Sequence, residues 1–293
     1  MLVLKKKNMS VLREIEDKMI RRNYSPSTIT SYLGVLKKYA SFCKVNNLDP
    51  KQDVHPFLHY IIQNNYSISY QNQAINAIKY YWKNILNKDK AYIEIDRPLK
   101  EKKLPEVLSL EEVSRIFDAC SNFKHLMILK TIYACGLRIS EVINLEYKDI
   151  NGERLTVRIK NAKGKKERIV PIPIELIEEL RSYFKVYRPY KYLFEGNGST
   201  KLQPKKYSPS SIRAIIKNMR QRARISRVIT PHTLRHSYAT HLYEYGINLR
   251  SIQVLLGHES SKTTEIYTRV SNIHISNTPS PLNFLKKKDA GKK

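Results

Sequence analysis

The chain has 293 residues, of which 41% are apolar, and this is enough for two ordinary domains that each contain a core. Lysine and arginine number 53 against 26 aspartates and glutamates, so the formal net charge is +27. The composition argues against global disorder. Because the positive charge is spread along the whole chain, a polyanionic partner is its simplest explanation.

Three kinds of polyanion compete as the partner. A membrane surface would favour a basic amphipathic helix or an apolar span of about 18 residues or more, and the sequence contains no such span. A small phosphorylated substrate would need only a local basic patch. Nucleic acid fits a long basic surface best, so we expect a nucleic-acid partner and no membrane.

The cysteines predict neither a disulfide framework nor a zinc site. Cys43, Cys120 and Cys135 are far apart, odd in number and form no C-x-x-C pair, so we expect three buried thiols. The N-terminal MLVLKKKNM has too few apolar residues before its charges for a signal peptide. We expect a reducing, intracellular location.

Residues 9–94 show helical periodicity only. Start signals lie at Ser10 and at Ser25, which is followed by Pro26 and an apolar repeat of three or four residues. Further helices are expected over 55–64 and 70–86. The first domain is therefore predicted to be all-helical.

The stretch 96–107, DRPLKEKKLPEV, has two prolines, several basic residues and no apolar periodicity, as an extended linker would. A second domain begins after it, with a capping box formed by Ser109 and Glu112. Alternation over 154–172 predicts a β-hairpin with Gly164 at its tip. Helices are expected near 173–187 and after the Ser-Pro and Thr-Pro pairs at 208–209 and 230–231.

The segment PHTLRHSYATHL places His232 and Arg235 on one face in the first turn of a helix. Unpaired N–H groups and the positive end of the helix dipole add to this site, which suits a phosphate. An exposed basic turn is the alternative. His232, His236 and His241 lie at helical spacings, but no cysteine pair or H-E-x-x-H motif accompanies them, so a metal site is not favoured. We interpret His236 and His241 as packing or helix-face residues.

Two further segments carry candidate residues. In ACGLRISEVINL, Gly136 breaks a helix and Arg138 precedes the next apolar run, where its planar fork suits two phosphate oxygens. A surface arginine is the alternative, and Glu141 either braces an arginine or caps the helix. In LLGHESSKTTEIYTRV, a short turn separates His258 from Tyr267, although most of the 20 tyrosines should be core or interface residues.

Together these segments resemble the tyrosine recombinases, or phage-type integrases. The shared features are G-L-R-x-S-E, a K-G hairpin, H-x-L-R-H, L-G-H and I-Y-T, in that order, and they cover essentially the whole chain. The length is similar to the compact Xer-like and transposon-integrase members. The resemblance implies a mainly α fold with an N-terminal helical DNA-clamping (SAM-like) domain over 1–95, the linker over 96–107, a mixed, mostly α catalytic domain with a small β-sheet over 108–275, and a tail over 276–293.

The resemblance also implies six catalytic residues, which are Arg138, Lys163, His232, Arg235, His258 and Tyr267. The arginines would clamp the scissile phosphate, the histidines would assist with protons and hydrogen bonds, and the tyrosine would attack. The K-G-x-K-x-R pattern favours Lys163 as general acid toward the 5′ oxygen, while Lys165 and Lys166 remain alternatives. Since fixed guanidinium groups can neutralise phosphoryl charge, no metal, ATP or other cofactor is expected.

The implied function is a site-specific recombinase or integrase that cleaves and rejoins double-stranded DNA through a 3′-phosphotyrosine intermediate and a Holliday junction. It would act as a homo-tetramer on paired sites in the cytoplasm, associated with the nucleoid, with or without an accessory DNA-bending protein. The tail would dock in trans on a neighbouring subunit, or be disordered. The alternatives are a type IB topoisomerase-like enzyme and a non-catalytic DNA-binding regulator, and the presence of all six residues argues against the regulator.

Overall fold

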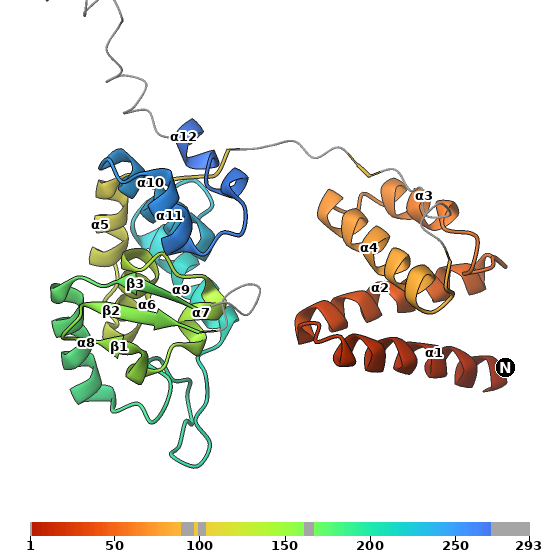
Figure 1. Ribbon diagram of the computed structural model, residues 1–293, viewed down its shortest axis with the longest axis horizontal. Helices are drawn as coiled ribbons and strands as arrows, with labels where there is room; N and C mark the ends of the chain where they lie inside the picture. Colours follow the sequence, from red (N-terminus) through yellow and green to blue (C-terminus); the bar gives the residue numbers. More distant parts are fainter. Residues whose placement is uncertain (1, 89–96, 99–103, 161–166, 271–293) are drawn as a thin grey trace, which may run out of the picture. The chain divides into compact units, whose positions relative to one another are not determined.

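The computed structural model describes residues 2–88, 97–98, 104–160 and 167–270, with side chains for those between 11 and 268. Contacts divide the chain into two compact units, Met1–Lys102 and Lys103–Lys293 (Figure 1). The prediction of a mainly α fold with a small sheet in the second unit is confirmed. None of the described helices combines the length and apolarity needed to span a bilayer.

The first unit consists of helices throughout its described part. They are α1 (Leu2–Arg21), α2 (Pro26–Val45), α3 (His55–Gln63) and α4 (Ile68–Asn84). Ser25 caps α2 by accepting a hydrogen bond from the backbone N–H of Thr28, and Ser67 caps α4 in the same way. Asn residues with positive φ follow the helix ends, at Asn23, Asn47 and Asn65, because asparagine tolerates the left-handed region at a turn.

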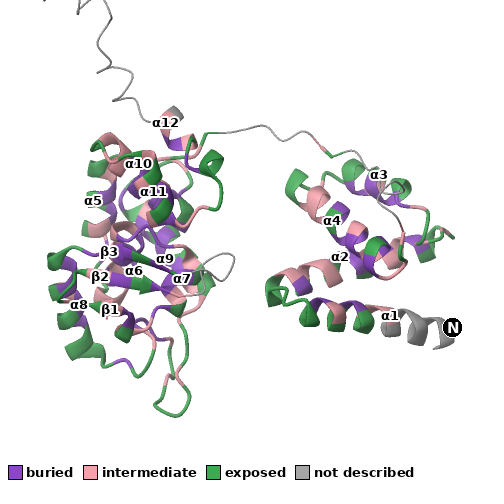
Figure 2. Cartoon of the chain, in the orientation of Figure 1, coloured by how far each residue is buried: buried purple, intermediate pink, exposed green. Residues whose placement is uncertain are grey.

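The core of the first unit lies between α2 and the three helices that pack on it, α1, α3 and α4. The core residues are apolar or aromatic, and Figure 2 shows the buried positions in purple on the facing sides of the helices. Tyr39 and Trp82 are buried, and their polar groups both donate to the carbonyl of Pro50, so neither is left without a partner. The chain connecting α2 and α3 is thereby fixed to the core.

The second unit is built from eight α-helices and a small sheet in its described part. The first elements are α5 (Leu110–Asp118), α6 (Phe123–Ala134), α7 (Ile139–Asn144), a 3₁₀ turn η2 (Tyr147–Asp149), β1 (Ile150–Asn151), β2 (Thr156–Ile159) and β3 (Arg168–Pro171). The later ones are α8 (Ile174–Tyr187), α9 (Pro209–Arg222), α10 (Pro231–Glu244), α11 (Leu249–Leu256), η4 (Ser261–Thr263) and α12 (Ile266–Val270). Helix α6 is central, because it packs against α8, α9 and α10.

The sheet is antiparallel with strand order β1-β2-β3. Val157 pairs with Val170, and both are buried, while the intervening Arg158 and Ile169 are exposed. The predicted hairpin is confirmed as the β2–β3 pair, but its tip with Gly164 and Lys163 lies outside the described residues. Strand β1 is too short to show an alternating pattern and was not predicted.

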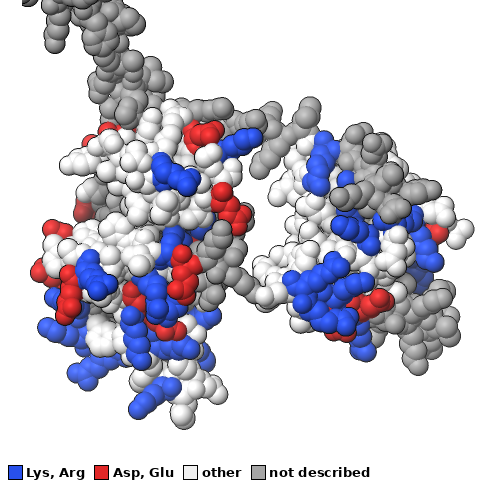
Figure 3. Space-filling model, viewed as in Figure 1, with Lys and Arg blue, Asp and Glu red and all other residues white. Residues whose placement is uncertain are grey.

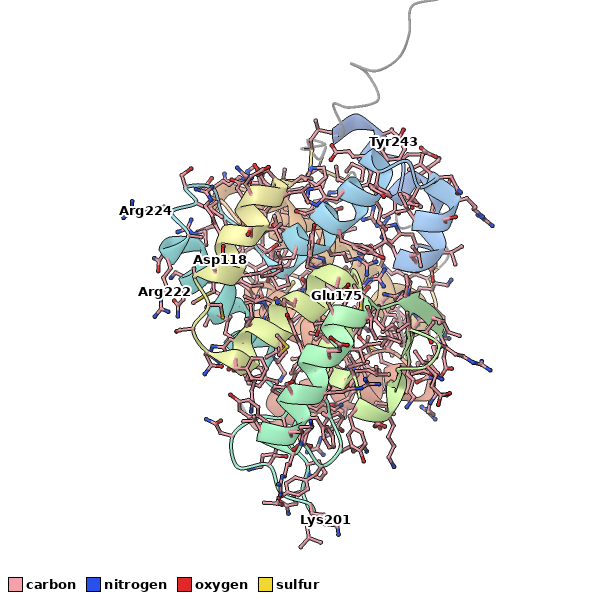
Figure 4. The ribbon with its side chains drawn as sticks, turned by 90° about the vertical axis from the view of Figure 1, so that its left-hand side faces the viewer. Asp118, Glu175, Lys201, Arg222, Arg224 and Tyr243 are labelled. Atoms are coloured by element: carbon pink, nitrogen blue, oxygen red, sulfur yellow. The ribbon has the colours of Figure 1, made fainter. Side chains whose placement is uncertain are left out.

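The ends of the second unit differ in character. Helices α10, α11 and α12 gather at one end (Figure 1), and the loop between α8 and α9 forms the other. Figure 4 shows this from a second side, with Tyr243 of α10 and Lys201 of the loop at opposite ends. All three cysteines are free and buried, as expected.

Predicted helix boundaries differ from the structure by up to several residues. Helix α1 begins at Leu2 and passes through Ser10, because the leucines, lysines and methionine around that position favour a helix and nothing stops it there. Helix α4 begins at Ile68, after the cap at Ser67, rather than at residue 70. Half of the predicted linker, namely residues 96 and 99–103, and the tail over 276–293 lie outside the described residues.

Candidate active site

Helix α10 begins with Thr230 as its cap and Pro231 in its first turn, which places Arg235 one turn into the helix. The Arg235 side chain is 3% exposed. Its Nη1 donates to the carbonyl of Gly136 at 2.6 Å, and its Nη2 donates to the carbonyl of Leu256 at 2.5 Å. Arg235 is therefore held between the end of α6 and the end of α11.

Arg138 reaches the same place from the start of α7. Gly136, with φ of +57°, ends α6 and lets the chain pass close to α10, where a Cβ on this residue would collide with the Tyr238 ring. The Nη2 of Arg138 donates to the carbonyl of Gly257 at 3.3 Å, and its Nη1 donates to Glu141 Oε1 at 2.7 Å. With 18% of its side chain exposed, Arg138 is the more accessible of the two arginines.

Glu141 is the buried carboxylate that holds the arginines together. It accepts two parallel hydrogen bonds from Arg168, at 2.7 and 2.8 Å, as well as the bond from Arg138. Arg235 Nη1 lies 3.6 Å from its other oxygen. Burial by itself raises the pKa of Glu141, but the bonds and charge of Arg168, with Arg138 and Arg235, lower it to about 2. The carboxylate is thus ionised at neutral pH.

The C-terminal end of α11 supplies the opposite side of this network. Its last carbonyls lack partners within the helix, and they carry the negative end of the helix dipole. Three successive carbonyls each accept from a different arginine: Leu255 from Arg168, Leu256 from Arg235 and Gly257 from Arg138. Gly257 ends the helix with φ of +62°. Arginines from β3, α7 and α10 therefore converge on one helix end.

Tyr267 lies on α12, and its side chain is fully buried. Its hydroxyl oxygen is 3.1 Å from Nδ1 of His236, and its ring is parallel to that of His258 with centroids 6.4 Å apart. Burial raises the pKa of Tyr267 to about 12, although the charges of Arg235 and Arg138 lower it. The hydroxyl is therefore protonated at neutral pH, and the two arginines are close enough to affect it.

The site histidines are neutral at pH 7. Burial, followed by the charges of Arg235 and Arg138, lowers the pKa of His258 to about 3. Burial, followed by the charges of His232 and Arg235, lowers the pKa of His236 to about 4. Nδ1 of His258 is hydrogen bonded to the Thr264 hydroxyl at 3.0 Å, which ties it to the turn before α12.

The structure brings five of the six predicted residues to one end of the second unit. Arg138 and Arg235 share the hydrogen-bond network just described, and their charges act on both His258 and Tyr267. The ring of His232 lies beside that of His236, the partner of the Tyr267 hydroxyl, with centroids 6.4 Å apart. Lys163 lies outside the described residues. For Glu141, the two alternatives left open both hold, because it braces arginines and also accepts the backbone N–H of Arg138 at the start of α7.

Two residues of the site were not predicted. The sequence predicts His236 to be a packing or helix-face residue, whereas in the structure its Nδ1 contacts the Tyr267 hydroxyl. His241 does fit that interpretation, since its ring joins Tyr133 to the carbonyl of Leu108. Arg168 was overlooked, although a signal existed: it shares a strand face with the buried Val170. An arginine on the inner face of a strand needs a buried partner.

Known proteins are similar to this chain in sequence and in fold. Residues 106–274 match the model of the phage integrase family, and residues 11–91 match the phage integrase N-terminal SAM-like domain. Tyrosine recombinase XerA of Pyrococcus horikoshii is 33% identical over 269 residues, covering 92% of each chain. Tyrosine recombinase XerD of Staphylococcus epidermidis is 34% identical over 272 residues, covering 87% of this chain and 92% of its own.

Two solved structures have a similar fold. The crystal structure of XerA recombinase matches with a TM-score of 0.54 and 26% identity, covering 93% of this chain and 99% of its own. XerH site-specific recombinase bound to palindromic difH substrate matches with a TM-score of 0.68 and 23% identity, covering 89% and 82%. The chain belongs to the phage integrase family and is a Xer-like tyrosine site-specific recombinase.

Proposed function

We propose that this recombinase binds double-stranded DNA and cleaves it with Tyr267 as the nucleophile, forming a 3′-phosphotyrosine bond. The observation that carries the proposal is that a buried tyrosine hydroxyl lies close enough to two fixed arginines for their charges to lower its pKa. A guanidinium group has five N–H donors, so Arg138 and Arg235 can hold their carbonyls and still bind phosphate oxygens. The net charge of +27 and the lysines and arginines on both units (Figure 3) favour DNA.

In the proposed step, the Tyr267 oxygen forms a bond to phosphorus while the bond from phosphorus to the 5′ oxygen breaks. The 5′ oxygen takes a proton from Lys163, the general acid, and the proton of the tyrosine hydroxyl passes to water. Arg138 and Arg235 neutralise the charge on the non-bridging oxygens, and His232 and His258 donate hydrogen bonds to them. One phosphodiester replaces another, so a free 5′ hydroxyl can reverse the step without ATP or metal.

The assembly follows from the same chemistry. Exchange between two duplexes needs four cleavable strands, so we propose a homo-tetramer on paired sites that passes through a Holliday junction. Residues 1–95 would grip the duplex, residues 108–275 would cut it, residues 96–107 would connect them, and residues 276–293 would dock on a neighbouring subunit. An accessory DNA-bending protein is compatible with this scheme, and we propose that the protein acts in the cytoplasm, on the nucleoid.

The test traps the covalent intermediate on a mixture of sequences, so that the protein itself selects its site. Protein is incubated with a pool of nicked duplexes of randomised sequence, which lose the 5′ hydroxyl fragment after cleavage, and adducts that survive denaturation are sequenced. We expect an adduct with wild-type protein, in the presence or absence of EDTA. Tyr267→Phe should abolish the adduct and still bind duplex, because only the attacking oxygen is removed.

The matched control is Tyr133→Phe, since Tyr133 is also hydrogen bonded to a histidine of α10 but lies on α6. This variant should keep the adduct. An adduct that persists in Tyr267→Phe, or a loss in both variants, would contradict the assignment. Joining between two recovered sites, assayed on one plasmid, separates recombination from relaxation of supercoils.

A further inference from the structure

The fully buried state of Tyr267 raises a question that its role as nucleophile does not answer. A hydroxyl that attacks a DNA phosphate must meet that phosphate, yet the Tyr267 side chain has no exposed surface here. Helix α12 packs on α10, and the hydroxyl contacts His236 of that helix. The described position of Tyr267 is therefore that of a nucleophile turned away from solvent.

The contact with His236 is specific in its geometry. Nδ1 of His236 and the hydroxyl oxygen of Tyr267 are 3.1 Å apart, and the ring centroids are 5.8 Å apart with the planes tilted by 53°. A hydrogen bond of this length needs one donor and one acceptor. Because the tyrosine is protonated and the histidine neutral at pH 7, the hydroxyl can donate to an unprotonated Nδ1.

A second pair, His241 of α10 and Tyr133 of α6, shows a His–Tyr hydrogen bond whose role is structural alone. Nδ1 of His241 is 2.8 Å from the Tyr133 hydroxyl, and its Nε2 is 2.9 Å from the carbonyl of Leu108. That carbonyl can only accept, so Nε2 donates and Nδ1 accepts, and both nitrogens are fixed between two helices and a loop. His236 instead forms its hydrogen bond with Tyr267, the proposed nucleophile.

We propose that His236 is a positioning residue that holds the Tyr267 hydroxyl in its buried place, by accepting its hydrogen bond at Nδ1, until DNA is bound. This rests on the proposed function only in taking Tyr267 as the nucleophile. In the proposal, the bond is broken before attack, so it stabilises the DNA-free enzyme and opposes cleavage. His236 is not the base that takes the tyrosine proton.

The general-base alternative is disfavoured by the same observations. A histidine whose pKa is lowered to about 4 is a poor acceptor for the proton of a hydroxyl whose pKa is raised to about 12. Burial first, and then the charges of His232 and Arg235 on the same helix, oppose a positive imidazolium at His236 and lower its pKa. His236 is therefore suited to accept a hydrogen bond and unsuited to keep a proton.

The experiment compares His236→Leu, which removes the acceptor at similar volume, with His236→Asn, which keeps an amide oxygen near the Nδ1 position. Tyrosines of the DNA-free protein are acetylated with N-acetylimidazole and mapped by mass spectrometry, with the buried Tyr183 as internal reference. In His236→Leu, we expect Tyr267 to react about two- to tenfold faster, as loss of one hydrogen bond implies, and Tyr183 to stay protected. His236→Asn should behave like wild type.

The rate of DNA cleavage gives a second readout, because this rate would not rise if His236 had only a structural role. With a duplex recovered by the trapping assay, the single-turnover adduct rate at saturating DNA should rise about two- to tenfold in His236→Leu, with unchanged duplex affinity. A lower rate at unchanged affinity would overturn the proposal, because it would make His236 part of the chemistry. Unchanged protection of Tyr267 would overturn it as well.

If His236→Leu does not fold, both Tyr183 and Tyr267 will react with N-acetylimidazole. A second measurement then tests the hydrogen bond between His236 and Tyr267. Tyr267→Phe removes the donor and keeps the ring, so the ¹⁵N signal of His236 Nδ1 in DNA-free protein should shift relative to wild type. The Nδ1 signal of His241 serves as the control and should not move. An unshifted His236 signal would overturn the proposal, whereas a failed adduct assay would overturn only the proposed function.

Discussion

The two units bury different kinds of side chain. In the described part of the first unit, Asn84 is the one buried polar residue, and the rest of the core is apolar or aromatic. The second unit buries charged side chains as well, among them Glu141, Arg168 and Arg235. Burying charges costs free energy unless they are paired and hydrogen bonded. The difference indicates that the core of the first unit serves stability alone, whereas the second unit accepts a cost in free energy in order to fix guanidinium groups.

The largest expected effect comes from Glu141→Gln, which keeps the shape of the side chain but leaves Arg168 and Arg235 without their counter-charge. Breaking a buried ion pair from one side should lower the free energy of unfolding of the second unit by about 3–5 kcal/mol. Urea unfolding checks this, with circular dichroism following both units. The single tryptophan, Trp82, reports on the first unit alone and should unfold as in wild type.

The same variant tests the pH dependence. The pKa of Glu141 is lowered from 4.5 to about 2 in the folded protein, so its contribution is fully present above the unfolded value. That contribution is lost as pH falls from about 4.5 through 2. Wild-type protein should therefore lose stability in this range, and Glu141→Gln should lose less. A pH slope equal in both proteins would show that other carboxylates dominate.

The next effect concerns the arginine that is most deeply held. Arg235→Lys keeps the charge but cannot bridge Gly136, Leu256 and a phosphate at once, because an ammonium group lacks the planar fork. We expect the adduct rate at saturating duplex to fall about 10²–10³-fold, with little change in duplex affinity. Arg97→Lys is the control, since Arg97 bonds Asn72 and Asn76 of the first unit, and its adduct rate should not change.

The smallest effect should be alike in the two units. Ile78→Val in the first core and Ile132→Val in the second each remove one methylene from a fully buried site. Each should cost about 0.5–1.5 kcal/mol in its own unit. Trp82 fluorescence follows the first, and circular dichroism follows the second. A much larger cost for Ile132→Val would mean that the charged network also depends on the packing of α6.

The sequence was sufficient where local rules determine the structure. Ser25, Ser109 and Thr230 begin their helices as expected, because each cap depends on residues within one turn. The β2–β3 pairing was likewise visible as alternation. Local rules failed where neighbouring turns compete, as at Ser10, which lies inside a longer helix.

The site was only partly predictable because its contacts join distant segments. Motif order indicated Arg138, Arg235, His258 and Tyr267, but it could not show that Arg168, from β3, shares Glu141 with them. His236 follows Arg235 directly, and nothing in its spacing distinguishes it from His241. Only the packing of α12 on α10 decides which histidine meets the nucleophile.

The end of α11 has a consequence for comparing such sites between proteins. Its three successive carbonyls hold three arginines, yet a carbonyl is the same whatever side chain its residue carries. Positions 255 and 256 can therefore vary in identity without any loss of acceptors, provided that the helix ends at the same place. These three acceptors depend on the position at which α11 ends. An alignment that compares only residue types would not detect them.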